Sequence, residues 1–206
     1  MKYFLDTEFI EGFHKPLFGK KRHFIDLISI GLVREDGLTY YAISTDFNGK
    51  DADSWVYANV IAQLPDRPNA DPFQHHAQRY WRSNETIKRD MLTFFGCWRD
   101  QLFYRAPEGI EIYGYYSDYD WVLFCSLFGR MIDLPKGFPM YCIDLKQTLD
   151  EKVRSGLFPQ PHRPQDFDDA LEMFKAQRNY PKQEDEHNAL SDAKWNRRLY
   201  DFLSNQ

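Results

Sequence analysis

Asp6 and Glu8 are two positions apart at the end of the first apolar run of the chain, Tyr-Phe-Leu-Asp-Thr-Glu-Phe. Residues two apart on a strand project from the same face, so this spacing predicts two neighbouring carboxylates at one strand edge. Such like charges raise each other's pKa unless a cation neutralises them. A hard divalent cation, which prefers oxygen ligands, is the simplest explanation. Because acidic pairs also occur on solvated surfaces, the interpretation needs further ligands from elsewhere in the chain.

A second acidic segment follows a buried apolar run at 110–114 and reads Ser117-Asp118-Tyr119-Asp120. Ser and Asp are preferred at helix N-caps, so one of these acids is expected only to begin a helix. Asp120 is followed by Trp-Val-Leu-Phe, the apolar face of that helix, and is expected to point inward. We therefore favour Asp120 as the third carboxylate and keep Asp118 as the alternative.

A third segment near the C-terminus contains His187 and Asp192. Five residues correspond to about 140° of rotation on an ideal helix, so the two side chains would not share a face if both were helical. Asn188 is a suitable N-cap, which places His187 in the loop before the helix. The small side chains of Ala189 and Ala193 would let this helix approach a sheet closely, so that Asp192 reaches the same place.

The order of elements predicts a mixed sheet. Asp36-Gly37 is a hairpin turn signal, and three strands joined by turns precede alternating strands and helices. This order is typical of an α/β fold in which antiparallel strands are followed by parallel ones, with helices on both faces. Strands are expected at about 2–6, 25–33, 38–44, 110–114 and 140–143; helices at about 54–63, 84–104, 119–131, 145–155, 167–175 and 188–203; loops at 10–24 and 156–166.

Composition limits the class of protein. The 206 residues suit a single domain spanning 1–206, and a hydrophobic content of 43 % predicts a well-packed core. The net charge of −5 argues against a protein that holds nucleic acid by bulk positive potential. It leaves room for an enzyme that grips a strand end, where metal ions supply the positive charge locally. Lys20 to His23, the compact basic run, is expected in a solvated loop.

The cysteines indicate a reducing compartment. Cys97, Cys125 and Cys142 lie in apolar segments and form no Cys-x-x-Cys pair, so they are expected to be small buried hydrophobic residues. The N-terminus has no signal-peptide pattern, and no apolar stretch approaches the length of a membrane span. The expectation is a soluble cytoplasmic protein that does not contact membranes.

Taken together, the three segments resemble a known group. Asp-x-Glu on the first strand, Tyr119-Asp120 at a later strand-to-helix junction and His187-x-Ala-x-x-Asp192 match the DEDDh 3′-to-5′ exonucleases of the ribonuclease H-like superfamily. The opening Tyr-Phe-Leu-Asp-Thr-Glu-Phe-Ile-Glu is similar to the small ribonuclease-T-like 3′-to-5′ exoribonucleases of mycobacterial type. One departure is that Tyr115-Tyr116-Ser117 stands where the family usually has His-Asn ahead of its Phe-Asp.

The resemblance implies a two-metal phosphodiesterase that releases nucleoside monophosphates from RNA 3′ ends. Four carboxylates would hold two Mg²⁺ ions, with Mn²⁺ able to substitute. Asp6 would bridge the ions, Glu8 and Asp192 would bind the one that carries the attacking water, and Asp120 would serve the other. His187 would be the general base. Relatives also imply a possible homodimer. The apolar residues beside the carboxylates are candidates to stack on the terminal base: Phe9, Ile10 and Phe13.

Two other functions remain open. The same chemistry could act on single-stranded DNA, because a preference for RNA needs a sensor of the 2′-hydroxyl and none can be located. A catalytically silent nucleic-acid-binding module of the same fold is a further alternative. The intact set of four acids and one histidine argues against it.

Overall fold

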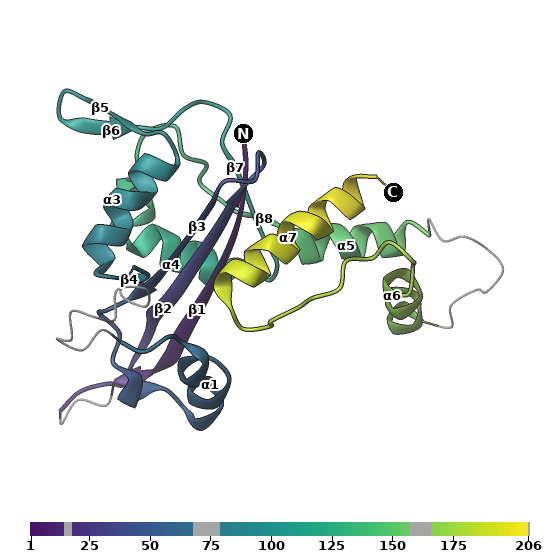
Figure 1. The fold of residues 1–206 in the computed structure, drawn as a ribbon, viewed down its shortest axis with the longest axis horizontal. Coiled ribbons are helices and arrows are strands. Elements are labelled where there is room, and N and C mark those ends of the chain that lie inside the picture. The colour runs from purple at the N-terminus through teal and green to yellow at the C-terminus, as the bar shows by residue number, and fades with distance from the viewer. Residues whose placement is uncertain (15–17, 68–78, 157–165, 206) are drawn as a thin grey trace.

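The computed structural model describes residues 1–14, 18–67, 79–156 and 166–205. Its main sheet has the strand order β4-β3-β2-β1-β7-β8 (Figure 1). The first three strands are antiparallel, whereas β7 joins β1, β8 joins β7 and β4 joins β3 in parallel, so the predicted mixed α/β sheet is confirmed. The strand bounds are β1 Lys2–His14, β2 Arg22–Arg34, β3 Thr39–Ser44, β4 Trp81–Arg82, β7 Glu111–Gly114 and β8 Ile143–Asp144.

The first two strands form a hairpin much longer than expected. β1 runs 13 residues to His14 and β2 begins at Arg22, so the predicted loop at 10–24 is wrong for most of its length. Pairing continues to His14 opposite Arg22, after a register shift between Glu8 and Phe9. Such a bulge bends a strand and raises its local twist. The basic run Lys20 to His23 is exposed, as predicted, although Arg22 and His23 belong to β2.

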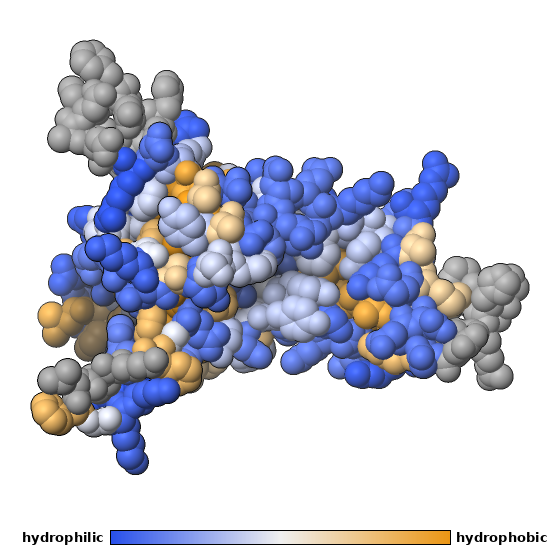
Figure 2. Space-filling model, turned by 90° about the horizontal axis from the view of Figure 1, so that it is seen from below, coloured by the Kyte–Doolittle hydropathy of each residue, from blue (hydrophilic) through white to orange (hydrophobic). Residues whose placement is uncertain are grey.

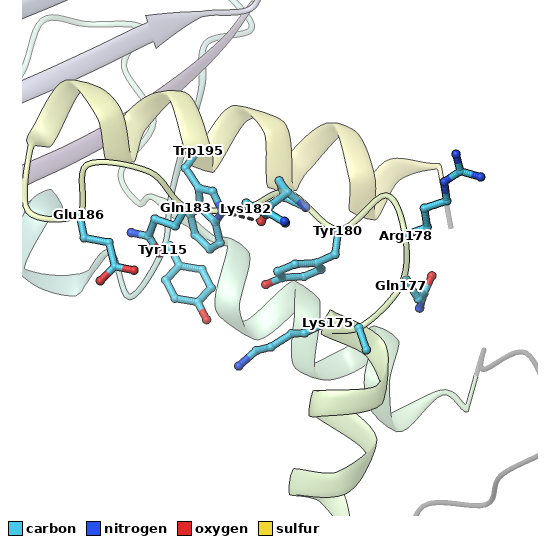
Figure 3. A pocket seen from close by; sticks show the side chains of 11 residues that line it. Tyr115, Lys175, Gln177, Arg178, Tyr180, Lys182, Gln183, Glu186 and Trp195 are labelled. Atoms are coloured by element: carbon cyan, nitrogen blue, oxygen red, sulfur yellow. Dashed lines mark hydrogen bonds between the residues drawn. The ribbon is translucent and has the colours of Figure 1, made fainter.

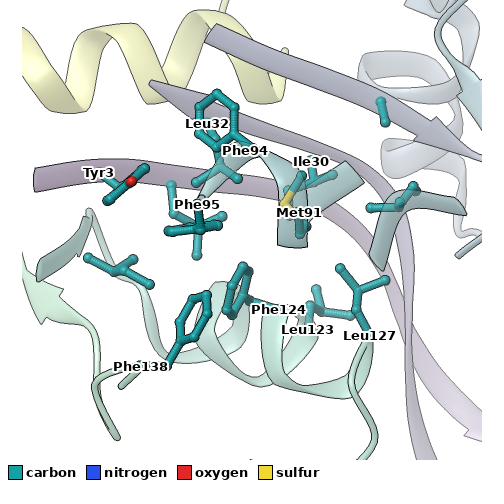
Figure 4. Close-up of a cluster of buried hydrophobic side chains, with 14 of the residues drawn as sticks. Tyr3, Ile30, Leu32, Met91, Phe94, Phe95, Leu123, Phe124, Leu127 and Phe138 are labelled. Carbon is teal, nitrogen blue, oxygen red and sulfur yellow. The ribbon is translucent and has the colours of Figure 1, made fainter. Parts of the chain in front are cut away.

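Helices cover both faces of the sheet, as predicted, and each face has its own core. One core contains Tyr3, Leu5 and residues of α3 (Asn84–Phe94) and α4 (Asp118–Ser126). Its aromatic centre includes Phe95, Phe124 and Phe138 (Figure 4). The opposite core contains Phe4 and residues of α5 (Leu145–Arg154), α6 (Phe167–Lys175) and α7 (Ala189–Ser204). Successive residues of β1 therefore point into different cores.

Several expected elements differ from the structure. The helix predicted at 84–104 ends at Phe94, because the chain turns at Gly96 with a φ of 68° and continues as a two-stranded hairpin, β5 (Trp98–Asp100) and β6 (Phe103–Arg105). The predicted helix at 54–63 is α1 (Ser54–Asn59) followed by the 3-10 turn η2 (Ile61–Gln63). The helix predicted to reach residue 131 ends at Ser126, before the 3-10 turn η3 (Met131–Asp133); another 3-10 turn, η1, covers Gly49–Asp51. Most of the predicted loop at 156–166 lies outside the described residues.

Helix α7 lies unusually close to the sheet. A Cβ atom added at Gly31 on β2 would lie 2.1 Å from the carbonyl oxygen of Ala189, the first residue of α7. Further along the helix, the buried side chain of Asn196 donates to the carbonyl oxygen of Leu5 at 2.9 Å. The absence of a side chain on one strand and a hydrogen bond to the next therefore fix α7 against the sheet.

The face at the hairpin end of the molecule is mostly hydrophilic, with apolar residues gathered on the half that carries the β1–β2 hairpin (Figure 2). Phe13, near the end of β1, and Phe18, before β2, are exposed. Among the described residues, no helix is long and apolar enough to cross a membrane. The three cysteines are free; Cys125 is buried and the other two are half-buried.

Candidate active site

Three acidic side chains that are far apart in the sequence meet beside β1. Asp6, Glu8 and Asp192 each offer a carboxylate oxygen, and these oxygens lie within 4.8 Å of one another. Asp6 and Glu8 alternate with Thr7 and project toward the face covered by α7, which is the face of Phe4. Gly31 pairs with Asp6 across the hairpin, so its missing side chain leaves the room in which α7 brings Asp192 to the cluster.

Asp120 approaches from the other side of β1. It lies in the first turn of α4 and is 6 % exposed. One of its carboxylate oxygens accepts a hydrogen bond from the Thr7 backbone N at 2.8 Å and another from Thr7 Oγ1 at 2.6 Å. Asp118, the sequence alternative, begins the same helix but is exposed. By burial and direction, Asp120 is the acid of this pair that faces the cluster.

Burial and mutual repulsion raise the pKa values of the four carboxylates. Burial raises the pKa of Asp6, and the charges of Asp120, Glu8 and Asp192 raise it further. Burial, followed by the charges of Asp192 and Asp120, raises the pKa of Glu8 to about 8. Burial also raises the pKa of Asp120 to about 7, against the hydrogen bonds from Thr7. Among the described residues, no lysine or arginine forms a salt bridge with these four carboxylates. Their mutual repulsion therefore indicates a place for bound cations.

Asp192 is held by the loop that precedes α7. Gln183 Nε2 donates to one of its carboxylate oxygens at 2.6 Å, and the backbone N of His187 donates to the other at 3.0 Å. Burial raises the pKa of Asp192, and both hydrogen bonds oppose the rise because they favour the ionised form. As predicted, Asn188 caps α7 and accepts from the backbone N of Leu190 and Ser191 at 3.2 Å.

His187 lies in the loop at the edge of the cluster, as expected from the Asn188 cap. Its backbone has a φ of 67°, a left-handed conformation that is uncommon for a residue with a side chain. Its imidazole ring packs edge-on against Trp55 of α1, with the ring centroids 4.9 Å apart. A cavity of about 450 Å³ opens beside it, between η2 and the loop before α7. The imidazole thus packs against Trp55 and also borders an open cavity.

The three apolar residues proposed to contact a base have different surroundings. Phe9 is half-buried and packs against Tyr119 with ring centroids 5.4 Å apart. Phe13 is 60 % exposed near the end of the hairpin. Ile10 is 1 % exposed and packs in a small hydrophobic cluster with Ile28 and Val60. Phe9 and Phe13 are therefore accessible to a base, whereas the side chain of Ile10 is buried and is not.

Sequence reasoning missed the residues that support the acids. Thr7 holds Asp120, Gln183 holds Asp192 and Trp55 supports His187. Thr7 had a detectable signal, because a polar residue between two acids on a strand must point to the opposite face. Gln183 and Trp55 had none, since each lies in a polar segment whose path is set by tertiary packing.

The donor set fits divalent cations. Hard metal ions prefer carboxylate oxygens. Oxygens of Asp6, Glu8 and Asp192 lie within 4.8 Å of one another, and Asp120 lies on the opposite side of β1, bound to Thr7. Metal binding would also relieve the repulsion that raises the pKa values. A mixed sheet whose first strand carries acids that meet acids from α4 and α7 defines a protein of the ribonuclease H-like class.

Comparison with known proteins narrows this class to one family. The 3′-5′ exoribonuclease Rv2179c-like domain matches residues 1–203, so the chain belongs to that family. It is 37 % identical over 171 residues to the 3′-5′ exoribonuclease Rv2179c of Mycobacterium tuberculosis strain H37Rv, covering 83 % of this chain and 85 % of the relative. The 3′-5′ exoribonuclease MT2234.1 of strain CDC 1551 matches with the same identity and coverage.

Proposed function

We propose that this chain is a metal-dependent 3′-5′ exoribonuclease that releases nucleoside monophosphates from RNA 3′ ends. The observation that carries the proposal is the convergence of Asp6, Glu8 and Asp192 within 4.8 Å, in a chain whose family and relatives are named for this activity. Four acids drawn from β1, α4 and α7 have no comparable structural purpose, because their mutual repulsion destabilises the fold.

We propose that Asp6, Glu8, Asp120 and Asp192 hold two Mg²⁺ ions, which Mn²⁺ can replace. Two such ions stabilise the attacking and the leaving oxygen of an in-line displacement at phosphorus. The protein contributes fixed positions for the oxygens, since Thr7 restrains Asp120 while Gln183 and the His187 backbone restrain Asp192. Restrained carboxylates need no rearrangement when the ions bind.

His187 is proposed to accept the proton of the attacking water. Its backbone is tied to Asp192, so its imidazole moves with one of the proposed ligands, and Trp55 limits its rotation. Phe9 and Phe13 are proposed to contact the terminal base. Stacking tolerates every base, which suits an enzyme that must remove each nucleotide in turn.

The test uses a 5′-labelled oligoribonucleotide with Mg²⁺ or Mn²⁺. The expected product is a ladder shortened one nucleotide at a time from the 3′ end, which EDTA abolishes. Asp6→Ala should remove the activity while the circular dichroism spectrum stays that of the folded protein. Digestion by Asp6→Ala at the wild-type rate would show that the metal site is wrongly assigned.

An oligodeoxyribonucleotide of the same sequence tests the alternative substrate, single-stranded DNA. RNA should be shortened faster than this DNA. A chain that binds RNA without shortening it, with either metal, would support the silent module instead. We also propose that residues 1–206 act as one domain in the cytoplasm; the family match over 1–203 and the free cysteines support this. Whether the protein works as a homodimer is decided by light scattering.

A further inference from the structure

A second cavity of about 720 Å³ lies beside the proposed metal site, between α6, α7 and the loop that joins them (Figure 3). We call it the tyrosine pocket, because Tyr115 and Tyr180 both line it. Its volume falls within the range of small-molecule binding sites. None of the residues assigned above to metal binding or catalysis lines it.

The tyrosine pocket is contiguous with the metal site. Gln183 lines the pocket and also donates to Asp192 at 2.6 Å, so one side chain separates the two. Tyr115 belongs to the turn between β7 and α4 that leads into Asp120. The turn that precedes Asp120 and the loop that precedes Asp192 therefore also contribute to the walls of this pocket.

The pocket offers aromatic faces that are held in place. Tyr115 packs edge-on against the buried Trp195 with ring centroids 5.0 Å apart. The indole of Trp195 is fixed by its hydrogen bond to the Pro181 carbonyl oxygen at 3.0 Å. Tyr180 packs edge-on against Phe202 at 5.4 Å. These contacts, together with the edge-on contact of Tyr115 with Tyr116 at 4.9 Å, restrain the two tyrosines where they line the pocket. Aromatic rings in such a position can stack on a planar ligand.

The charge of the pocket is opposite to that of the chain. Its charged lining residues are three cations and one anion, Lys175, Arg178, Lys182 and Glu186, whereas the chain carries a net −5. The side chain of Lys175 extends from α6 in the direction of Tyr115, and Arg178 points away from the others (Figure 3). The ion pair of Lys175 is with the exposed Glu172, at 3.1 Å, and is weak in solvent. Lys175 is therefore available to an anionic ligand.

We infer that the tyrosine pocket binds an upstream nucleotide of the RNA strand, with its base on the tyrosine rings and its phosphate near Lys175. A planar ring and an anion, side by side, are what aromatic faces next to a lysine recognise. This inference rests on the proposed function: a strand whose 3′ end occupies the carboxylates must leave across the rim, and the pocket is part of that rim.

The test compares variants on a 5′-fluorescein hexaribonucleotide. Tyr115→Leu should raise KM about tenfold through lost stacking, and Lys175→Gln should raise it about threefold and reduce the slope of log affinity against log salt by about 0.7. The kcat should change much less than KM, since neither side chain touches the scissile bond. Lys88→Gln is the matched control: its pair with Glu85 on α3 has nearly the same exposure as the Lys175–Glu172 pair.

Adenosine 5′-monophosphate as an inhibitor distinguishes an upstream nucleotide from a free one. If the pocket holds a nucleotide upstream of the 3′ end, Tyr115→Leu and Lys175→Gln should be inhibited by adenosine 5′-monophosphate with nearly the same inhibition constant as the Lys88→Gln control. An inhibition constant that rises as much as KM would overturn the assignment in favour of a free nucleotide. KM values of Tyr115→Leu and Lys175→Gln equal to that of the control would overturn it entirely.

Anisotropy of the labelled hexamer in EDTA supplies a measurement that does not depend on turnover. If the wild-type protein binds the hexamer but never shortens it, the proposed function fails, while weaker binding by Lys175→Gln still supports the pocket. If the wild-type protein digests RNA and both variants bind it equally well, the pocket alone is excluded. Should Tyr115→Leu fail to fold, Lys175→Gln on the surface of α6 decides the question.

Discussion

Asp120 and Asp192 flank the same strand but are held in different ways. Asp120 is fixed from the protein core: its two hydrogen bonds come from the backbone and hydroxyl of a single β1 residue, Thr7, which is 5 % exposed. Asp192 is fixed by the loop before α7, through the exposed residue Gln183 and the backbone of His187. One half of the site is built into the sheet, and the other half depends on a loop that also lines the proposed binding site for the RNA strand.

This difference assigns separate tasks to the two halves. The sheet half can hold its oxygen in one place through every turnover. The loop half joins a proposed metal ligand, the proposed general base and the wall of the tyrosine pocket in one short segment, so movement there would alter all three together. Loops on a rigid scaffold commonly carry function in this way.

The largest effects are expected from removing either acid. Asp120→Asn and Asp192→Asn should each reduce kcat/KM on the order of a thousandfold, because each loses a charge that the proposed ions require. The metal-free proteins should be at least as stable as the wild type, since burial raises the pKa of both acids. Steady-state kinetics and thermal melts measure the two quantities; full activity in either variant would contradict the four-ligand site.

Next in size is the removal of the residues that hold the acids. Thr7→Val should lower kcat/KM about 10- to 100-fold and lower the free energy of unfolding by about 1–3 kcal/mol, because a buried carboxylate loses a donor. Gln183→Ala should lower kcat/KM by a similar factor with a smaller loss of stability, since its site is on the surface. Equal losses of stability in urea unfolding would remove the contrast between the two halves.

The pH dependence of the metal-free protein should reveal the repulsion directly. Burial and neighbouring charges raise the pKa of Glu8 from 4.5 to about 8 in the folded chain, so the folded state binds more protons than the unfolded state between those values. The contribution of Glu8 to the free energy of unfolding is therefore fully present below about pH 4.5 and is lost as the pH rises through 8.

Thermal melts in EDTA from pH 5 to 9 check this, with Glu8→Gln as the variant whose melting temperature should depend less on pH. Added Mg²⁺ or Mn²⁺ should raise the melting temperature more at high pH than at low pH, because the ligands must be deprotonated. A melting temperature that rises with pH in the wild type and not in Glu8→Gln would contradict the assigned direction.

The smallest effect is expected at Asp118. It is exposed in the first turn of α4, where a negative charge interacts favourably with the helix dipole by about 0.3–1 kcal/mol. Asp118→Asn should therefore leave kcat/KM nearly unchanged and lower the stability slightly. A large loss of activity would make Asp118 rather than Asp120 the functional acid of this turn.

The sequence was informative where a residue's neighbours along the chain determine its place. Alternation on β1 predicted that Asp6 and Glu8 share a face, and the Asn188 cap predicted His187 in a loop. It was less informative where pairing decided the structure. The sequence predicts a loop over residues 10–14 and 22–24, yet these residues extend the hairpin because each strand supplies the other's hydrogen bonds. Trp98 to Arg105 has the apolar content of a helix, but Gly96 turns the chain into a hairpin.

Gly31 shows how a single side chain outside the proposed metal site could abolish it. It is not a proposed ligand and is distant in the chain from the four acids of the site. A single methyl group at this position would nevertheless lie 2.1 Å from the Ala189 carbonyl oxygen and force α7 outward. The helix carries Asp192, so the gap between Asp192 and Asp6 would widen without any ligand being replaced. A search for inactive members of this family should therefore inspect position 31 as well as the acids. In a protein with all four carboxylates and an alanine at this position, the carboxylates would lie too far apart to bind the ions.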